Sequence, residues 1–205
     1  MHKGIIVMKN EIEFYKYIEL LSHVTRFKSN EAMHTNVAAH TFGTLFIAYD
    51  LMNKFDLKLD KKHVMEMLLF HDIVEAGMEF DIEAPKAEMD QKLGEYKRTS
   101  ELKKVKKISK DTGRPYIYDL FVEIEAKETR EAKFAKFVDG FEAQNHILNN
   151  ECKGFNTEED FDYVLNKLNA PLDEFPELKP YVDEVKSKIV AYKNKVVKKN
   201  KKQLA

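Results

Sequence analysis

The sequence predicts an all-α fold, and three observations support this prediction. Only 7 glycines and 5 prolines interrupt the 205 residues, and good helix formers dominate the rest. Apolar residues recur at spacings of three and four through most of the chain, as they do in helices that bury one face. The balance of 43% hydrophobic and 34% charged residues is typical of a globular protein that can bury a substantial core.

Composition also narrows the classes of partner and compartment. The net charge of -1 and the pI near 6.7 argue against a domain that wraps nucleic acid, so we do not expect a nucleic-acid partner. The lone Cys152 excludes an internal disulfide and fits a reducing compartment. The apolar run that ends at Met8 is too short for a signal peptide or a membrane span. We therefore expect a cytoplasmic protein with no membrane partner.

Two helices are expected before residue 55. The first has Asn10 as its N-cap, and apolar residues at helical spacing extend it to about Arg26. The second is expected over about 36–54, with His40 in its first turns. Its buried face is expected to consist of Val37, Phe42, Leu45, Phe46, Tyr49 and Met52.

A third helix is expected to begin at Asp60, to lead into the stretch HDIVEAGMEFD, residues 71–81, and to end near Gly77, with Asp81 in the loop that follows. The His-Asp pair follows a run too apolar for a surface helix, where lost hydration would be costly unless something binds the two side chains. If the helix continues, Glu75 lies on the same face as His71 and Asp72. The plain alternative is a helix end at which His and Asp meet water.

The remaining helices are separated by breaks that contain Gly, Pro or Asn. Their expected ranges are 86–110 for one or two solvated helices, 116–127, 128–149, a short helix capped by Thr157 and a final helix from Tyr181. The change of character after Asn150 predicts a first domain over 1–150 and a C-terminal helical appendage over 151–205. Six lysines between residues 193 and 202 form a tail that we interpret as a solubilising helix end.

Three polar positions could carry chemistry, but each has a plain alternative. Asp139 stands among phenylalanines and needs a cation or hydrogen-bond donors, which a lysine salt bridge could supply. Arg26 and the adjacent Phe27 could bind a phosphate and cover a sugar or base, although most adjacent Arg-aromatic pairs only pack at the surface. His40 alone would more often be a hydrogen-bonded core residue than a ligand.

Together, His40, the His71-Asp72 pair and Asp139 supply two imidazoles and two carboxylates, a set that suits a first-row divalent metal. The order His, His-Asp, Asp resembles the pattern of the HD-domain metal-dependent phosphohydrolases. Three longer matches are NVAAH, LLFHDIVEAGMEFDIEAP and ETREAKFAKFVDGFEAQ. They are most similar to the branch that contains bacterial 5'-deoxynucleotidases and their eukaryotic relatives, and they cover roughly residues 26–148.

The resemblance implies an HD-domain helical bundle with a C-terminal helical extension, and it implies a role for each site residue. The implied metal ligands are His40, His71, Asp72 and Asp139, and the metal is Co, Mn, Zn, Fe or Mg. Glu75 would manage protons, and Asp81 would orient the scissile phosphate or its leaving oxygen. Arg26 and Phe27 would hold phosphate and sugar.

The chain also departs from this branch. Relatives usually carry an acidic residue just before the first His, whereas this chain has Ala39, which leaves the support of the His40 imidazole open. The loop from Glu75 to Asp81 is one residue longer than in the bacterial nucleotidases. Phe27 stands at a position where this branch carries a larger indole side chain.

The leading function hypothesis is a metal-dependent phosphohydrolase in which metal-activated water cleaves the phosphate of deoxynucleoside 5'-monophosphates. The first alternative is a deoxynucleoside triphosphate hydrolase that releases triphosphate. The second alternative is a non-catalytic HD binding module with a structural metal. A small-molecule nucleotide is the expected partner, and a homodimer is a second one, because helical relatives of this kind often dimerise.

Overall fold

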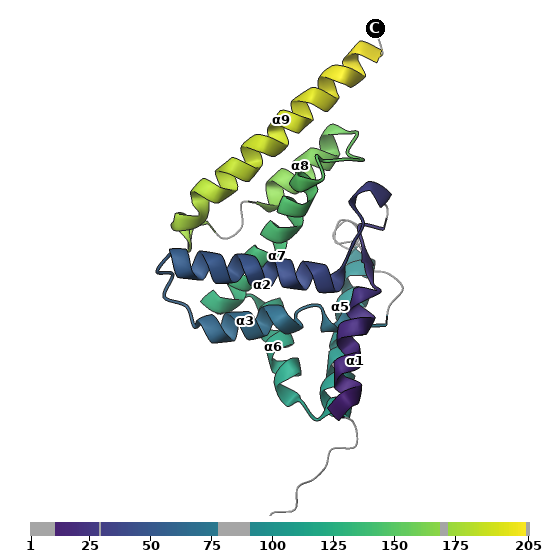
Figure 1. Cartoon of the computed structure of the whole chain (residues 1–205), viewed down its shortest axis with the longest axis vertical. Helices are drawn as coiled ribbons and strands as arrows, with labels where there is room; N and C mark the ends of the chain where they lie inside the picture. The colour runs from purple at the N-terminus through teal and green to yellow at the C-terminus, as the bar shows by residue number, and fades with distance from the viewer. Residues whose placement is uncertain (1–10, 29, 78–90, 169–171, 204–205) are drawn as a thin grey trace, which may run out of the picture.

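The computed structural model describes residues 11–28, 30–77, 91–168 and 172–203 (Figure 1). The α-helices are α1 (Glu11–Ser22), α2 (Val37–Lys54), α3 (Lys61–Phe70), α5 (Gln91–Thr112), α6 (Pro115–Ala126), α7 (Arg130–Asn149), α8 (Glu158–Lys167) and α9 (Lys179–Gln203). Short 3-10 helices are η1 (Glu31–Met33), η2 (Ile73–Glu75) and η3 (Pro176–Leu178), and two short strands are β1 (Thr25–Arg26) and β2 (Thr35–Asn36). The predicted all-α fold is confirmed. The expected cap Asn10 and the predicted site residue Asp81 lie outside the described residues.

The first helix is shorter than expected, because α1 ends at Ser22 and Arg26 belongs to β1. β1 pairs antiparallel with β2, with Arg26 opposite Thr35. Val24 is fully buried just before the strand, and its carbonyl accepts a hydrogen bond from the Val37 amide at 3.1 Å. These contacts keep the backbone of Arg26 extended beside the start of α2. A longer α1 would have placed Arg26 farther from α2.

The bounds of α2 agree with the prediction, but its buried face agrees only in part: Val37 and Met52 are buried as expected. Asn36 caps the helix by accepting a hydrogen bond from the Ala39 amide at 2.8 Å. The expected core residues Phe42, Phe46 and Tyr49 are 70%, 67% and 65% exposed. The buried residues are Val37, His40, Thr41, Thr44, Ala48, Leu51 and Met52. Smaller side chains dominate this face because α3 and α7 pack against α2 there.

The third helix begins as expected and ends earlier than expected. The Asp60 side chain accepts a hydrogen bond from the His63 amide at 3.0 Å and caps α3. The helix ends at Phe70, and η2 follows as a separate 3-10 turn. The prediction of one continuous helix through Glu75 is therefore wrong. Gly77 follows with a φ of 77°, the left-handed conformation that suits a glycine.

The helices α5, α6 and α7 form the lower part of the body and the link to the C-terminal region. α5 extends to Thr112, so the expected loop is reduced to Gly113 and Arg114, and Pro115 begins α6. Both α6 and α7 bury an apolar face. These faces consist of Ile117, Leu120, Phe121 and Ile124 on α6, and Ala132, Phe134, Ala135, Phe137, Val138 and Phe141 on α7.

One large buried cluster joins α2, α3, α6 and α7 to α8 and α9. A smaller cluster joins η2, α5 and α6, and Phe14 and Tyr17 of α1 pack against it. Figure 1 shows α7 passing behind α2 and leading up to α8 and α9, with α9 projecting from the body. Thr157 caps α8 as expected, through a reciprocal capping box with Asp160. Because the large cluster contains residues from both sides of residue 150, the division into a domain and an appendage stays a prediction.

Within the described ranges, no helix has both the length and the apolar character needed to cross a membrane.

Candidate metal centre

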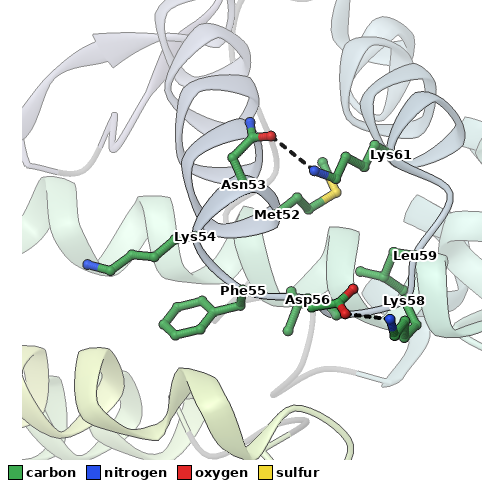
Figure 2. A pocket seen from close by; sticks show the side chains of 9 residues that line it. Met52, Asn53, Lys54, Phe55, Asp56, Lys58, Leu59 and Lys61 are labelled. Atoms are coloured by element: carbon green, nitrogen blue, oxygen red, sulfur yellow. Dashed lines mark hydrogen bonds and ion pairs between the residues drawn. The ribbon is translucent and has the colours of Figure 1, made fainter.

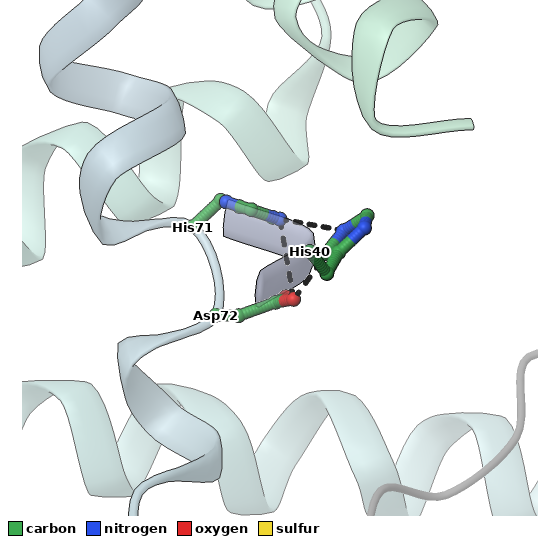
Figure 3. A group of neighbouring side chains, drawn as sticks. All are labelled: His40, His71 and Asp72. Carbon is green, nitrogen blue, oxygen red and sulfur yellow. Dashed lines mark hydrogen bonds and ion pairs between the residues drawn. The ribbon is translucent and has the colours of Figure 1, made fainter. Parts of the chain in front are cut away.

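The side chains of His40, His71 and Asp72 meet between α2 and the end of α3 (Figure 3). The two Nε2 atoms lie 3.3 Å apart. The Asp72 Oδ2 atom is 3.2 Å from Nε2 of His71 and 3.7 Å from Nε2 of His40. One potential ligand atom from each residue lies within 4.8 Å of the other two. The structure therefore brings three of the four predicted metal ligands together at one point.

The end of α3 explains how two consecutive residues reach the same point. His71 is the C-cap, and its Nδ1–H donates to the Leu68 carbonyl at 2.6 Å. That carbonyl belongs to the last turn of a helix, where carbonyls lack intrahelical partners. Asp72 then leaves helical geometry with a φ of -105° and a ψ of 12°. The change of direction turns the Asp72 side chain back toward α2.

Asp139 reaches the same place from α7. Its Oδ1 atom lies 3.1 Å from Nε2 of His40 and 3.9 Å from Nε2 of His71. Both imidazoles thus turn their Nε2 atoms toward carboxylates. The fourth predicted ligand therefore lies beside the two histidines, on a third helix.

Each of these carboxylates also has a cationic neighbour. Arg26 Nη1 lies 3.0 Å from Oδ2 of Asp72. Lys136, one turn before Asp139 on α7, places its Nζ 3.1 Å from Oδ2 of Asp139 and 3.0 Å from Oε1 of Glu125. The predicted lysine salt bridge of Asp139 thus exists together with the predicted metal-site contacts, so the two explanations are not exclusive.

The charges of the site keep both carboxylates ionised. Burial alone would raise the pKa of Asp72, but the neighbouring His71 and Arg26 charges hold it well below its usual range. Burial would likewise raise the pKa of Asp139, but the Lys136 charge and the His40 hydrogen bond outweigh burial and lower it. Two ionised carboxylates are therefore available as ligands at neutral pH.

Glu142 is a residue of the site that the sequence prediction missed. It lies on α7 and accepts a hydrogen bond from Nδ1–H of His40, whose side chain is fully buried. The open question raised by Ala39 is thereby answered, because a carboxylate supports the imidazole from another helix. Burial and the Arg26 charge lower the pKa of His40, but the hydrogen bonds that its ring makes to Asp139 and Glu142 outweigh them and raise the pKa above its ordinary value.

The donor set fits a divalent first-row metal. Each imidazole uses Nδ1 for an acceptor, Glu142 or the Leu68 carbonyl, so its Nε2 is the atom that can bind a metal. Ligand atoms bonded at about 2.1 Å to one ion lie about 3 Å apart, close to the separations of 3.1–3.3 Å between several of these atoms. Two nitrogen and two carboxylate ligands suit Mn, Fe, Co or Zn, with positions left for water and substrate.

Glu75 follows the His71-Asp72 pair in the chain on η2, and its side chain is buried. Burial lowers the pKa of Lys104 on α5, and the charge of Glu75 opposes this lowering. The end of α3 separates Glu75 from His71, and η2, which carries Glu75, packs against α5. The position of Asp81 lies outside the described residues.

Arg26 and Phe27 occupy different parts of the site. Arg26 contacts Asp72 directly, as described above. Phe27 has a φ of 56° and stacks on the His146 ring with centroids 5.2 Å apart. Because His146 lies two helical turns after Asp139 on α7, the Phe27 ring is about 10 Å along that helix from the metal ligand.

A separate hollow of about 300 Å³ lies at the opposite ends of α2 and α3 (Figure 2). It is lined by residues between Met52 and Lys61, and its lysines have partners: Lys58 pairs with Asp56, and Lys61 donates to Asn53. None of the predicted site residues that the structure describes lines this hollow. The group of His40, His71 and Asp72 is therefore the candidate site.

The chain belongs to the HD domain family, whose pattern it matches over residues 18–179. No curated protein matches it. Solved structures give the same fold. A protein of Pyrococcus horikoshii OT3 is 20% identical with a TM-score of 0.68, and the match covers 86% of this chain and 99% of that one.

Two further structures are similar to this chain. A conserved hypothetical protein from Pyrococcus furiosus is 19% identical, with a TM-score of 0.68 and coverage of 86% and 99%. A protein of Magnetospirillum magnetotacticum named a predicted metal-dependent phosphohydrolase is 22% identical, with a TM-score of 0.64 and coverage of 88% and 95%. At these identities the likeness establishes the fold, and the function is argued from the site.

Proposed function

We propose that this protein is a metal-dependent phosphohydrolase that releases phosphate from deoxynucleoside 5'-monophosphates. The observation that carries the proposal is the convergence of His40, His71, Asp72 and Asp139, with Arg26 in contact with one of the carboxylates. Membership of the HD domain family supports the hydrolase class. The similarity to a protein named a predicted metal-dependent phosphohydrolase agrees with it.

A bound divalent metal would lower the pKa of a coordinated water and offset charge on a phosphoryl oxygen. His40, His71, Asp72 and Asp139 would hold that ion, and Arg26 would stabilise the charge of the phosphate. A guanidinium carries five donors in a planar fork, so the ion pair with Asp72 is compatible with a second contact to a phosphate oxygen. Arg26 thereby fixes the phosphate next to the ligands.

Glu75 is the proposed proton-transfer residue. Its side chain is buried, and it follows the His71-Asp72 pair on η2, which packs against α5. Transfer of a proton to the leaving nucleoside oxygen at this position would lower the barrier to P–O cleavage. Asp81 keeps its proposed role of orienting the scissile phosphate.

The charges around the site favour a monophosphate over a triphosphate. Two lysines of α7 that could meet additional phosphates already have acidic partners: Lys133 pairs with Glu174, and Lys136 pairs with Glu125. A triphosphate would require these ion pairs to open. Phe27 lies along α7 at the distance of a sugar or base from the metal ligands, which supports a nucleoside as the leaving group.

The test is a screen of metals against nucleotides that measures inorganic phosphate and triphosphate separately. The proposal expects inorganic phosphate from deoxynucleoside monophosphates in the presence of Mn²⁺, Co²⁺ or another divalent ion. Release of triphosphate from deoxynucleoside triphosphates, with no turnover of monophosphates, would overturn the proposal and favour a deoxynucleoside triphosphate hydrolase. Metal binding with no turnover of any nucleotide would favour the non-catalytic binding module.

We also propose a homodimer. Phe42, Phe46 and Tyr49 form an exposed ridge at helical spacing on α2. Three aromatic side chains about two-thirds exposed offer on the order of 400 Å², roughly half of what one partner buries in a stable interface. Light scattering tests this proposal, because F46K should convert a dimer to a monomer and a monomeric wild type would refute it.

The cytoplasm remains the proposed compartment. The single cysteine, Cys152, is buried, and burial raises its pKa to about 11, so its thiol is poorly reactive. Fractionation of cells that express the tagged protein tests the location.

A further inference from the structure

The contact between Glu142 and His40 joins two helices at the metal centre. Nδ1–H of His40 donates to Oε2 of Glu142, and Nε2 of the same ring lies 3.1 Å from Oδ1 of Asp139. Glu142 follows Asp139 by three residues on α7, so both carboxylates lie on the same helical face. One ring of α2 is thus held at both nitrogens by two carboxylates of α7.

Gly43 provides the space that this contact needs. It follows His40 by three residues on α2 and faces the Glu142 side chain. A Cβ atom at Gly43 would lie 2.9 Å from Oε1, 3.0 Å from Cγ and 3.2 Å from Cδ of Glu142. A glycine inside a helix costs up to about 1 kcal/mol relative to alanine, so its presence here is explained by the close approach of Glu142.

We propose that Glu142 is a positioning residue for the metal ligand His40, and that Gly43 is required for Glu142 to reach it. This inference rests on the metal site of the proposed function. By accepting the Nδ1 proton, the Glu142 carboxylate fixes the tautomer that leaves Nε2 as the metal-binding nitrogen, and it fixes the ring plane. The negative charge also makes the imidazole a more basic ligand. Ala39, the residue before His40, has no side-chain acceptor that could do this.

Metal affinity tests the proposal without any substrate. The metal-free wild type, E142A, E142Q and G43A are titrated with Mn²⁺ by calorimetry, and the melting temperature of each metal-free protein is recorded. Removing a carboxylate that orients a metal-bound histidine typically weakens metal binding by about 10–100-fold, so this loss is expected for E142A and G43A. E142Q should lose less, because its amide oxygen can accept the same hydrogen bond.

Gly140 offers a matched control for the Gly43 variant. It is a glycine of α7, and a Cβ built on it meets nothing within 4 Å. G140A therefore gains the same intrinsic helix propensity as G43A but leaves Glu142 undisturbed. We expect it to bind Mn²⁺ like the wild type.

The outcome separates a positioning role from a structural one. If E142A and G43A bind Mn²⁺ within about threefold of the wild type, the inference is overturned, even if their melting temperatures fall. If G140A weakens binding as much as G43A does, the role of Gly43 is overturned. A wild type that turns over no nucleotide would sink the proposed function, but a lower Mn²⁺ affinity of E142A would still support the role of Glu142.

Discussion

Replacement of Lys136 by methionine tests whether Asp139 is a metal ligand. Lys136 Nζ lies 3.1 Å from Asp139 and 3.0 Å from Glu125. Burial alone would lower the pKa of Lys136, but the charges of Asp139 and Glu125 outweigh burial and keep it above its usual value. At an effective dielectric constant of about 20, one such contact is worth about 5 kcal/mol of Coulomb attraction. The cost of desolvation and the partial exposure of the side chains reduce the net loss to about 2 kcal/mol.

For a chain of this length, K136M should therefore lower the melting temperature of the metal-free protein by about 4–8 °C. A bound divalent ion would replace the missing positive charge beside Asp139. The rise in melting temperature on addition of Mn²⁺ should then be larger in K136M than in the wild type. Differential scanning fluorimetry with and without a chelator measures both effects.

Lys133 supplies the matched control. It lies one turn earlier on the same helix and pairs with Glu174, with about a third of each side chain exposed. K133M should cost less than about 1 kcal/mol and leave the metal-induced shift unchanged. If the shift in K136M equals that of the wild type or is smaller, Asp139 does not bind the metal, and the four-ligand assignment is refuted.

Three further outcomes are expected. Glu75→Gln should retain Mn²⁺ affinity while turnover falls by about 100-fold or more, and unchanged turnover of every nucleotide would remove Glu75 from the mechanism. Arg26→Lys keeps the charge but loses the planar fork, so kcat/KM should fall by about tenfold or more, and an unchanged value in steady-state kinetics would exclude Arg26 as the phosphate ligand. The pKa of His40 is raised above 6.5 in the folded protein, so its stabilising contribution is present below that pH and is lost as the pH rises through the folded value. Thermal melts in chelator should therefore show that the stability of the wild type declines above about pH 6.5. The assignment would be contradicted if the stability of the wild type rose over this pH interval while that of H40N did not.

Local signals in the sequence predicted the start of several helices correctly. Asp60 and Thr157 each cap a helix where expected, because a short polar side chain before an apolar periodic segment satisfies the first free amides without help from distant residues. The end of α3 was less predictable. The pattern after Phe70 is compatible with a helix, and only the hydrogen bond of His71 to the Leu68 carbonyl and the following 3-10 turn show the change of direction.

The choice of buried face on α2 could not be made from hydrophobicity. Phe42 and Phe46 form the more apolar stripe, but the helix buries His40 and Thr44 because α3 and α7 approach that side. This packing is tertiary, and a buried imidazole is acceptable only because carboxylates from α7 meet it. In hindsight, an imidazole within a helix and small residues beside it were the signal for this face.

The candidate ligands of the site could be predicted from the sequence, but most of the residues around them could not. His40, His71, Asp72 and Asp139 follow a spaced pattern in one dimension, and the structure brings them together. Glu142 shares a helical face with Asp139, and that spacing was the available signal. Its partner could not be inferred, because the contact depends on how closely α2 and α7 pack at Gly43.

The most direct test of the metal-dependent phosphohydrolase is a titration of metal-free protein with Mn²⁺ in which bound metal and phosphate released from a deoxynucleoside monophosphate are measured in the same samples. Phosphate release should rise in proportion to bound Mn²⁺ and level off when the site is filled. Both signals should be lost in H71A, whose imidazole lies 3.3 Å from that of His40 in the proposed site. Phosphate release by metal-free protein, or full activity of H71A, would contradict the account.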